Sequence, residues 1–518
     1  MKKIGHFLLQ FLPIILILIL GAYLRLYKID QYMTFLGDEG RDVLTVERMI
    51  VDGKWTLLGP TASVGGFFMG PIYYYFMLPF LWAWRLNPVG PAIMVALFGI
   101  LTIFLVYHVG KRLISPRVGL IAALFYAVSP LVISYSRSSW NPNIVPFFAL
   151  SMIYLLWRAK QYNRWNELFW VGICAGIGLQ LHYTFLFLFG VVLVWILFYA
   201  RSWKYIYSYA LGILGFLIGF APFLAFEVRH GFTNTRAIFE FIFFGKDTGF
   251  QQSHFFQNIG DVYFRLFGRL ILRIPDPGVL GNMSHITRYT WNGVTLIVAL
   301  ICGVVLVLRC KYFLFKKKNN EIVSFVLFLL WLVIPIILFG VYKKNIYDYY
   351  FGLFFPLPFF LIAIAIDQLM GVKKVGGIIG GIIIIAIAFF NWQGRPFIYQ
   401  PNNQLGQVQL IDRAVLAQTD NKPFNFALIT GGNSDHAYRY FFEIWGRPSV
   451  TIEYPGADPQ RKTITNQLMV VCEDTSCQPL GDSLWEVAGF GRAQIAGEWD
   501  VSVVKVYKLV HYQEPLSK

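Results

Sequence analysis

The segment FLLQFLPIILILILGAYLRLY, residues Phe7 to Tyr27, decides the class of fold. A helix needs about 20 predominantly apolar residues to cross the hydrocarbon core of a bilayer, which is about 30 Å thick. This segment is long enough, and it lacks a small-x-small cleavage site even though Lys2 and Lys3 precede it. We therefore predict that it is an uncleaved first membrane span.

Similar apolar runs of about 17 to 25 residues recur as far as Asn391. The chain is 57% hydrophobic and 14% charged, whereas a soluble domain carries about 25% charged residues. The sequence therefore predicts a mainly α-helical, polytopic membrane protein of about eleven transmembrane helices. The expected spans are 7–27, 89–109, 118–135, 143–157, 167–181, 184–200, 205–226, 289–308, 322–341, 351–369 and 375–391.

The charge of the loops sets the predicted orientation. The net charge is +16, but the 44 Lys and Arg residues lie in short loops rather than on one folded surface, so a nucleic-acid partner is not expected. One set of alternate loops, which contains Arg158, Lys160, Arg164, Arg309 and Lys311 among others, carries 17 basic residues against three acids, Glu167, Glu321 and Asp367. Because inner loops are rich in Lys and Arg, this set is predicted to face the cytoplasm.

The apolar segment Pro71 to Trp84 would reverse every later loop if it crossed the membrane. It is shorter than the roughly 17 residues that crossing requires. We predict an interfacial or re-entrant helix on the outer side. The outer elements are then a loop at about 28–88, a loop at about 227–288, and the C-terminal region.

Residues 392–518 differ in composition from the transmembrane domain, residues 1–391. Phe426–Thr430, Leu468–Cys472 and Val501–Val510 are typical of strands, and Ser434–Trp445 is typical of a helix. A small extracytoplasmic α/β domain is expected. Cys472 and Cys477 either form a disulfide there or stay as free thiols.

The first outer loop contains Asp38 and Glu39, followed by apolar residues at helical spacing. Asp38 can cap this amphipathic helix while Glu39 complements its dipole. Alternatively, a carboxylate placed just beyond the first span acts as general base toward a hydroxyl of a lipid-linked substrate. In that case we expect Asp38 to lie in an outward-facing cavity bounded by the first-loop helix, the turn from Tyr135 to Asn143 and the junction at His182-Tyr183. Arg41, one turn further on, is expected to line the same cavity.

Several outer residues are candidates for binding an anion or lining a cavity. Arg137, in the turn from Tyr135 to Asn143, either pairs with a phosphate or places its charge at the interface. His182 and Tyr183 lie between two spans, where a lone His is more often a packing residue. The remaining candidates are Arg229, Lys343 and Lys344 as phosphate ligands, and Tyr135 and Asn141 as cavity residues.

In the second outer loop, Arg265, Arg269 and Arg273 recur every four residues. This spacing predicts one basic helical face. Contact with anionic head groups is favoured over contact with a substrate phosphate.

Other motifs are missing from the sequence. There is no P-loop, GxGxxG after a strand, HExxH or zinc-spaced Cys/His set, so nucleotide-driven chemistry and a structural zinc site lose support. No charged residue lies in the middle of an expected span. Ion-coupled transporters usually carry such groups, so a pump or symporter is disfavoured.

The order of these features resembles the GT-C glycosyltransferases: a first span, Asp38-Glu39 at the head of a juxtamembrane helix, Gly70 to Tyr75 (GPIYYY), Gly110-Lys111-Arg112, and then Tyr135-Ser136-Arg137. It is most similar to the glycosyltransferase family 39 group, which includes protein mannosyltransferase-like and aminoarabinose transferase-like enzymes. The resemblance covers roughly residues 7 to 230.

The resemblance implies transfer of a sugar from a polyprenyl phosphate carrier to an acceptor hydroxyl outside the membrane, with inversion. It implies that Asp38 is the catalytic carboxylate and Glu39 its neighbour. Two positions depart from the family pattern. Met69-Gly70-Pro71 stands where many relatives have Lys-Pro-Pro, and Asn141 stands where others have Asp.

The expected partners are therefore the polyprenyl phosphate sugar donor, membrane lipids, and a protein, lipid or glycan acceptor. No cofactor is assigned, although a divalent cation is compatible with this chemistry. The expected location is the plasma membrane. The alternatives are a lipid or polysaccharide translocase without catalytic activity, and a receptor-like assembly protein whose C-terminal domain binds a partner.

Overall fold

The computed structural model describes residues 2–62, 65–245, 247–316, 319–474 and 476–513. The chain forms two compact units. The first contains Met1–Tyr27, Trp55–Met77 and Ala92–Gln400; the second contains Lys28–Lys54, Leu78–Pro91 and Pro401–Lys518. Residues 28–54 and 78–91 thus belong to the same unit as the C-terminal part of the chain. The predicted domains, 1–391 and 392–518, are instead each one continuous stretch of sequence.

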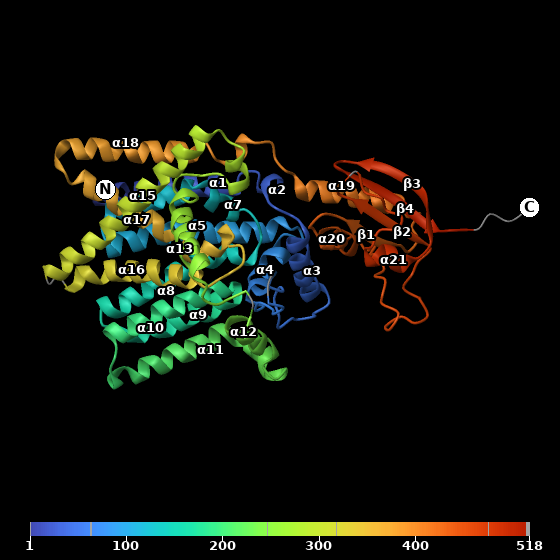
Figure 1. Cartoon of the computed structure of the whole chain (residues 1–518), viewed down its shortest axis with the longest axis horizontal. Coiled ribbons are helices and arrows are strands. Elements are labelled where there is room, and N and C mark those ends of the chain that lie inside the picture. Colours follow the sequence, from blue (N-terminus) through green and yellow to red (C-terminus); the bar gives the residue numbers. More distant parts are fainter. Residues whose placement is uncertain (1, 63–64, 246, 317–318, 475, 514–518) are drawn as a thin grey trace, which may run out of the picture. The chain divides into compact units, whose positions relative to one another are not determined.

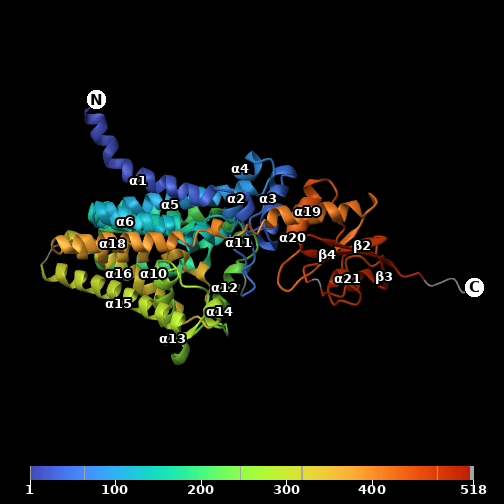
Figure 2. The same ribbon diagram turned by 90° about the horizontal axis from the view of Figure 1, so that it is seen from above.

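The first unit is helical. Helices α8, α9 and α11 run side by side (Figure 1), and α6 packs along α18 (Figure 2). Its α-helices are α1 (Lys2–Leu26), α5 (Val89–Leu113), α6 (Pro116–Val128), α7 (Pro130–Tyr135), α8 (Val145–Gln161), α9 (Leu168–Leu181), α10 (Phe187–Tyr199), α11 (Ile206–Arg229), α12 (Thr233–Phe243), α13 (Gln252–Gly268), α14 (Pro277–Gly281), α15 (His285–Phe315), α16 (Asn319–Gly340), α17 (Pro356–Met370) and α18 (Lys373–Trp392).

Short 3₁₀ helices join several of these elements. They are η1 (Asn141–Ile144), η2 (Trp165–Glu167), η3 (Tyr183–Leu186), η4 (Trp203–Tyr205), η5 (Asp348–Phe354) and η6 (Pro396–Ile398).

Each of the eleven expected spans coincides with a helix or a pair of helices. Within the described residues, five helices are long and apolar enough to cross a membrane, or six if η5 and α17, bent by 62°, are one span. The other expected spans coincide with shorter helices, and α6 is separated from α7 at Ser129 because Pro130 starts a new helix. Eleven crossings therefore stay a prediction.

Helix α4 (Ile72–Ala83) occupies the short apolar segment that the charge pattern keeps out of the membrane. It has 12 residues, which span about 18 Å at the usual rise per residue. This length is well short of the hydrocarbon core. The length of α4 is thus consistent with a helix that does not cross.

The second unit combines helices with a four-stranded sheet. The sheet order is β1-β2-β4-β3, with β1 parallel to β2 and the other pairs antiparallel. Its elements are α2 (Ile29–Tyr32), α3 (Gly37–Val51), α19 (Gln404–Ala417), β1 (Asn425–Ile429), α20 (His436–Ile444), β2 (Gln467–Cys472), α21 (Trp485–Phe490), β3 (Ala493–Val501) and β4 (Val504–His511).

Strands β1, β2 and β4 and helix α20 match the predicted elements to within three residues. Strand β3 is absent from the prediction. It lies at the edge of the sheet, where none of its residues is fully buried, so its apolar pattern is weak. The structure also contains the Cys472–Cys477 disulfide, with the two Cα atoms 6.1 Å apart.

Candidate functional site

The first turn of α3 is closed by Glu39. Its Oε2 accepts a hydrogen bond from the backbone N–H of Leu36 at 3.1 Å, and the residue is only 6% exposed. The N-cap position is Leu36, so Asp38 already lies inside the helix. The alternative in which Asp38 caps the helix is therefore wrong. Glu39 instead accepts the hydrogen bond that closes the first turn.

The carboxylate of Asp38 is open to solvent, with 56% of its side chain exposed. Its Oδ1 accepts a hydrogen bond from Arg41 Nη1 at 2.8 Å. The same guanidinium is anchored by Asp42, which is fully buried and lies 2.8 Å from Nη2. Arg41 thus orients an accessible carboxylate that can accept a proton from an approaching group.

The start of α3 is fixed by the loop that follows β1. The backbone N–H of Gly37 donates to Asn433 Oδ1 at 2.8 Å, and Asn433 Nδ2 donates to Glu473 Oε1 at 2.7 Å. Thr430 donates its hydroxyl to the other carboxylate oxygen of Glu473. The carboxylate following β2 therefore supports the turn that carries Asp38.

Two glycines allow this close approach. A Cβ added to Gly37 would lie 2.0 Å from Ser434 Oγ, and one added to Gly40 would lie 2.3 Å from the backbone nitrogen of Ala437. At the far end of α3, Arg48 makes two hydrogen bonds of 2.9 Å to the carboxylate of Glu443. Helix α3 is therefore attached to α20 at both ends.

His436, the first residue of α20, belongs to the same group of polar side chains. Its Nδ1 lies 2.9 Å from Ser434 Oγ, and the charges of Asp38 and Arg41 both act on it. Burial lowers the pKa of His436, so its imidazole is neutral near pH 7. Sequence reasoning missed His436, Asn433 and Glu473, because no local spacing connects them with residues 37–41.

Burial gives Glu39 an unusual titration. Loss of hydration raises the pKa of its carboxyl from 4.5 to about 7, although the backbone hydrogen bond from Leu36 opposes this shift. The folded protein therefore binds this proton more tightly than the unfolded chain, and stability falls as pH rises from about 4.5 to 7.

Glu39→Gln should remove this pH dependence while keeping an oxygen for Leu36. The thermal unfolding midpoint of the variant, relative to the natural protein, is expected to be higher at pH 8 than at pH 5. The underlying difference is at most roughly 3 kcal/mol. A difference between the two proteins that does not change with pH would contradict the assignment.

In the first unit, Arg137 lies in a buried setting. It is 1% exposed, and it donates to the carbonyls of Leu24 at 2.9 Å and Tyr27 at 2.7 Å. Its guanidinium also stacks on the Phe397 ring at 5.2 Å. Arg137 therefore joins the end of α1 to the turn after α7. Its expected role as a phosphate ligand stays a prediction, and that role would require these carbonyl bonds to be exchanged.

The turn after α7 is joined to the junction at His182. Asn141 donates to the carbonyl of Leu181 at 2.5 Å, a bond that an ionised Asp cannot make because it has no donor. The packing of Tyr349 links Trp140, at 4.4 Å between ring centroids, with His182, at 5.7 Å. This part of the predicted cavity wall is therefore assembled within one unit.

His182 is a buried packing residue in this wall. Its Nδ1 accepts from the backbone N–H of Thr184 at 3.2 Å, and burial lowers its pKa to about 4. The ring is therefore neutral at physiological pH. The neighbouring Tyr183 hydrogen-bonds through its hydroxyl to the carbonyl of Phe68 and receives a bond of 3.3 Å from Asn234.

The remaining predicted residues fall in three places of the first unit. Tyr135 ends α7 and packs against Phe355 at 5.9 Å between centroids. Arg229 is exposed at the end of α11. Lys344 Nζ lies 3.2 Å from Asp247 Oδ1, and the backbone N–H of Lys343 donates to the Asp247 carbonyl.

The basic residues of the second outer loop bind carboxylates of the chain itself. Asp348 accepts from Arg265 at 2.5 Å and from Arg269 at 2.7 Å, and further bonds join these arginines to Asp261 and Asp276. Helix α13 ends at Gly268, so the three predicted arginines do not form one helical face. The prediction of one basic helical face is wrong. Arg265 and Arg269 instead form an ion-pair network with Asp348.

No group of three or more His, Cys, Asp or Glu residues that could hold a metal ion occurs within the described residues. A divalent cation therefore has no assigned ligands in this part of the chain.

Comparison with known proteins gives a family likeness over part of the chain. A family model described as dolichyl-phosphate-mannose-protein mannosyltransferase matches residues 71–226. No curated protein sequence matches the chain.

The fold is similar to that of two solved structures. ArnT from Cupriavidus metallidurans, bound to undecaprenyl phosphate, has a TM-score of 0.62 and 13% identity, over 96% of this chain and 97% of that one. The archaeal oligosaccharyltransferase AglB from Archaeoglobus fulgidus, in complex with an inhibitory peptide and a dolichol-phosphate, has a TM-score of 0.54 and 12% identity, over 89% and 69%. The resemblance to GT-C membrane glycosyltransferases of the family 39 type is thereby confirmed.

Proposed function

We propose that the protein transfers a sugar from a polyprenyl phosphate donor to an acceptor hydroxyl at the extracytoplasmic face of the plasma membrane, with inversion at the anomeric carbon. The single observation that carries this proposal is the exposed carboxylate of Asp38 in the first turn of α3, held by Arg41. The family model and the GT-C fold support it. The two similar structures contain undecaprenyl phosphate and dolichol-phosphate, which favours a donor of this lipid class.

In this mechanism Asp38 accepts the proton of the acceptor hydroxyl as its oxygen attacks the anomeric carbon. The bond between that carbon and the phosphate oxygen breaks, and polyprenyl phosphate leaves with the electron pair. A phosphate is a good leaving group that needs positive charge rather than a general acid, and a well-placed donor can lower such a barrier by about 3 to 4 kcal/mol. Lys343, Lys344 and Arg229 are the candidate donors in the first unit.

The reaction is tested with the full chain reconstituted in vesicles and a polyprenyl phosphate carrying a radiolabelled sugar. Acceptors are supplied as a membrane extract that lacks this protein. We expect labelled acceptor and an equal amount of free polyprenyl phosphate. Movement of intact donor across the bilayer without free polyprenyl phosphate would instead identify a translocase.

A further inference from the structure

The first unit contains a cavity with several polar residues in its walls, at the end of α9 opposite to His182. It has a volume of about 920 Å³ and lies between the end of α8, η2, α9 and the start of α11. The lining residue of α9 nearest to His182 is Cys174, eight residues earlier, so about 12 Å of helix separates the cavity from His182. The cavity is therefore distinct from the wall formed by Asn141, His182 and Tyr349.

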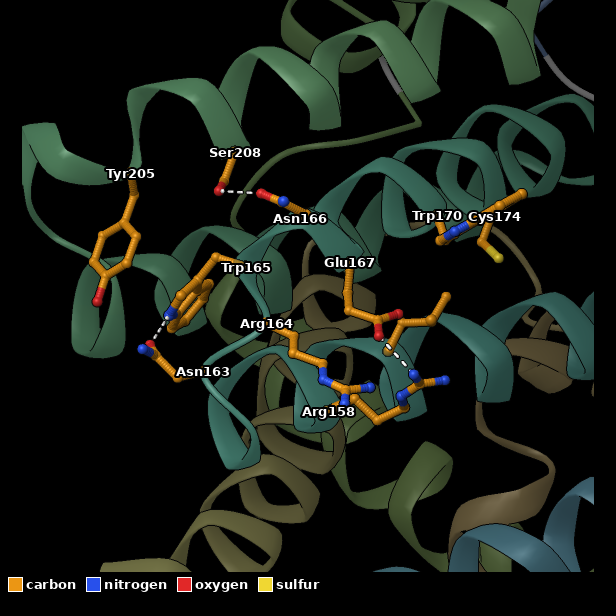
Figure 3. Close-up of a pocket in the computed structure, with 11 residues that line it drawn as sticks. Arg158, Asn163, Arg164, Trp165, Asn166, Glu167, Trp170, Cys174, Tyr205 and Ser208 are labelled. Atoms are coloured by element: carbon orange, nitrogen blue, oxygen red, sulfur yellow. Dashed lines mark hydrogen bonds and ion pairs between the residues drawn. The ribbon is translucent and has the colours of Figure 1, made fainter.

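The walls of this cavity are rich in hydrogen-bond donors (Figure 3). Trp165 Nε1 donates to Asn163 Oδ1 at 3.1 Å, and Ser208 donates to Asn166 Oδ1 at 3.2 Å. Because an indole N–H is only a donor, Asn163 must use its oxygen there, which leaves its NH₂ group as a donor. With both amide oxygens engaged, the two asparagines offer NH₂ groups, and these suit an anion.

Positive charge adds to this preference. Arg158 and Arg164 line the cavity, and Glu167 is their acidic neighbour, 2.6 Å from Arg158. The guanidinium of Arg164 is exposed and stacks on Tyr162 at 5.8 Å. Residues 155–208 contain five basic residues and one acid, so the net charge around the cavity is positive.

Two exposed tryptophans at this end of the unit are typical of residues at a membrane surface. Trp170, in the cavity wall, is 55% exposed, and Trp203, at the start of η4, is 86% exposed. Exposed Trp residues beside Lys and Arg are typical of the interface between hydrocarbon and water. Leu155 and Cys174 give the same cavity an apolar side.

A neighbouring cavity in the same unit has mainly apolar walls. It has about 820 Å³ between α9, α10 and α11 and is lined mostly by apolar residues such as Leu193 and Phe216. Such walls offer few hydrogen-bonding groups to a ligand. The cavity at Arg164 differs because it offers several donors together with an apolar side.

We propose that the cavity lined by Arg158, Arg164, Asn163 and Asn166 binds the phosphate of an anionic membrane phospholipid, whose acyl chains leave past Trp170. Basic pockets between helices on the cytoplasmic side bind such head groups, and this end carries the charge predicted to face the cytoplasm. The site does not depend on the proposed sugar transfer.

The test measures binding of phosphatidylglycerol to the purified full chain in a neutral detergent, by displacement of a fluorescent phosphatidylglycerol. Arg164→Gln is compared with Lys311→Gln, because Lys311 is an exposed residue of α15 that is predicted to face the same side. Each variant removes one positive charge. General attraction of an anion is therefore matched between them.

We expect Arg164→Gln to weaken phosphatidylglycerol binding about tenfold, because a charge-assisted hydrogen bond is lost, and Lys311→Gln to change it less than about twofold. Phosphatidylglycerol should also raise the unfolding midpoint of the natural protein more than phosphatidylcholine does, which tests the site without any variant. Equal weakening by both variants, equal effects of the two lipids, or displacement by inorganic phosphate alone would each overturn the proposal.

Discussion

Asp38→Asn is expected to lower the rate of sugar transfer by about 10² to 10⁴, the usual contribution of a positioned general base. The amide has nearly the same volume as the carboxylate, and its oxygen can still accept the hydrogen bond from Arg41. It cannot take a proton from the acceptor hydroxyl. The fold should be preserved, because Glu39 rather than Asp38 closes the start of α3 and Arg41 keeps its contact with Asp42.

A matched control lies on the other end of the same helix. Asp52 follows α3, is partly exposed and pairs with Lys54 at 2.6 Å, as Asp38 pairs with Arg41. Asp52→Asn should leave the transfer rate within about twofold, since surface ion pairs contribute little. Release of free polyprenyl phosphate by vesicles containing each variant measures the rate. Near-natural turnover by a folded Asp38→Asn protein would remove Asp38 from the mechanism.

Much of the helical layout was predictable from the sequence, because apolar runs of spanning length leave few alternatives. The segments 89–109 and 322–341 correspond closely to α5 and α16. The limits of the method are visible at Ser129 and Pro130, where one apolar run becomes two helices. Hydropathy measures the length of a run, whereas proline determines where the backbone hydrogen bonds stop.

The candidate site was predictable only where residues lie close together in sequence. Asp38, Glu39 and Arg41 stand within one helical turn, so the helix itself brings them together. Asn433 and Glu473 reach the same turn through the fold of the sheet. The burial of Arg137 also depends on distant parts of the chain, namely the end of α1 and Phe397. The charge of Arg137 and its position in a loop therefore could not predict that backbone carbonyls bind its guanidinium.

The contact between α3 and α20 explains why glycine occurs at position 40, and it leads to a second prediction. Gly40→Ala places a Cβ 2.3 Å from the nitrogen and 2.4 Å from the Cα of Ala437. These atoms belong to backbone, so the clash cannot be relieved by a side-chain rotation. Overpacking of this kind costs about 1 to 3 kcal/mol, and it moves the turn that carries Asp38.

Gly260→Ala is the matched control for this change, because Gly260 lies inside α13 and nothing lies within 4 Å of an added Cβ. In both helices alanine favours the helix over glycine by about 1 kcal/mol, but only the alanine at position 40 clashes with a neighbouring backbone. Gly260→Ala should therefore stabilise its helix, whereas Gly40→Ala should destabilise α3.

For Gly40→Ala we expect faster amide hydrogen exchange over residues 37–51 and at least a tenfold loss of transfer. For Gly260→Ala we expect slower exchange over residues 252–268 and unchanged transfer. If Gly40→Ala protects its helix as Gly260→Ala does and transfers sugar at the natural rate, close packing against α20 is not what positions Asp38. The loss is expected because a displacement of about 1 Å at a catalytic group is enough to cost about a hundredfold in rate, and the first turn of α3 cannot move away from Ala437 without moving Asp38 with it.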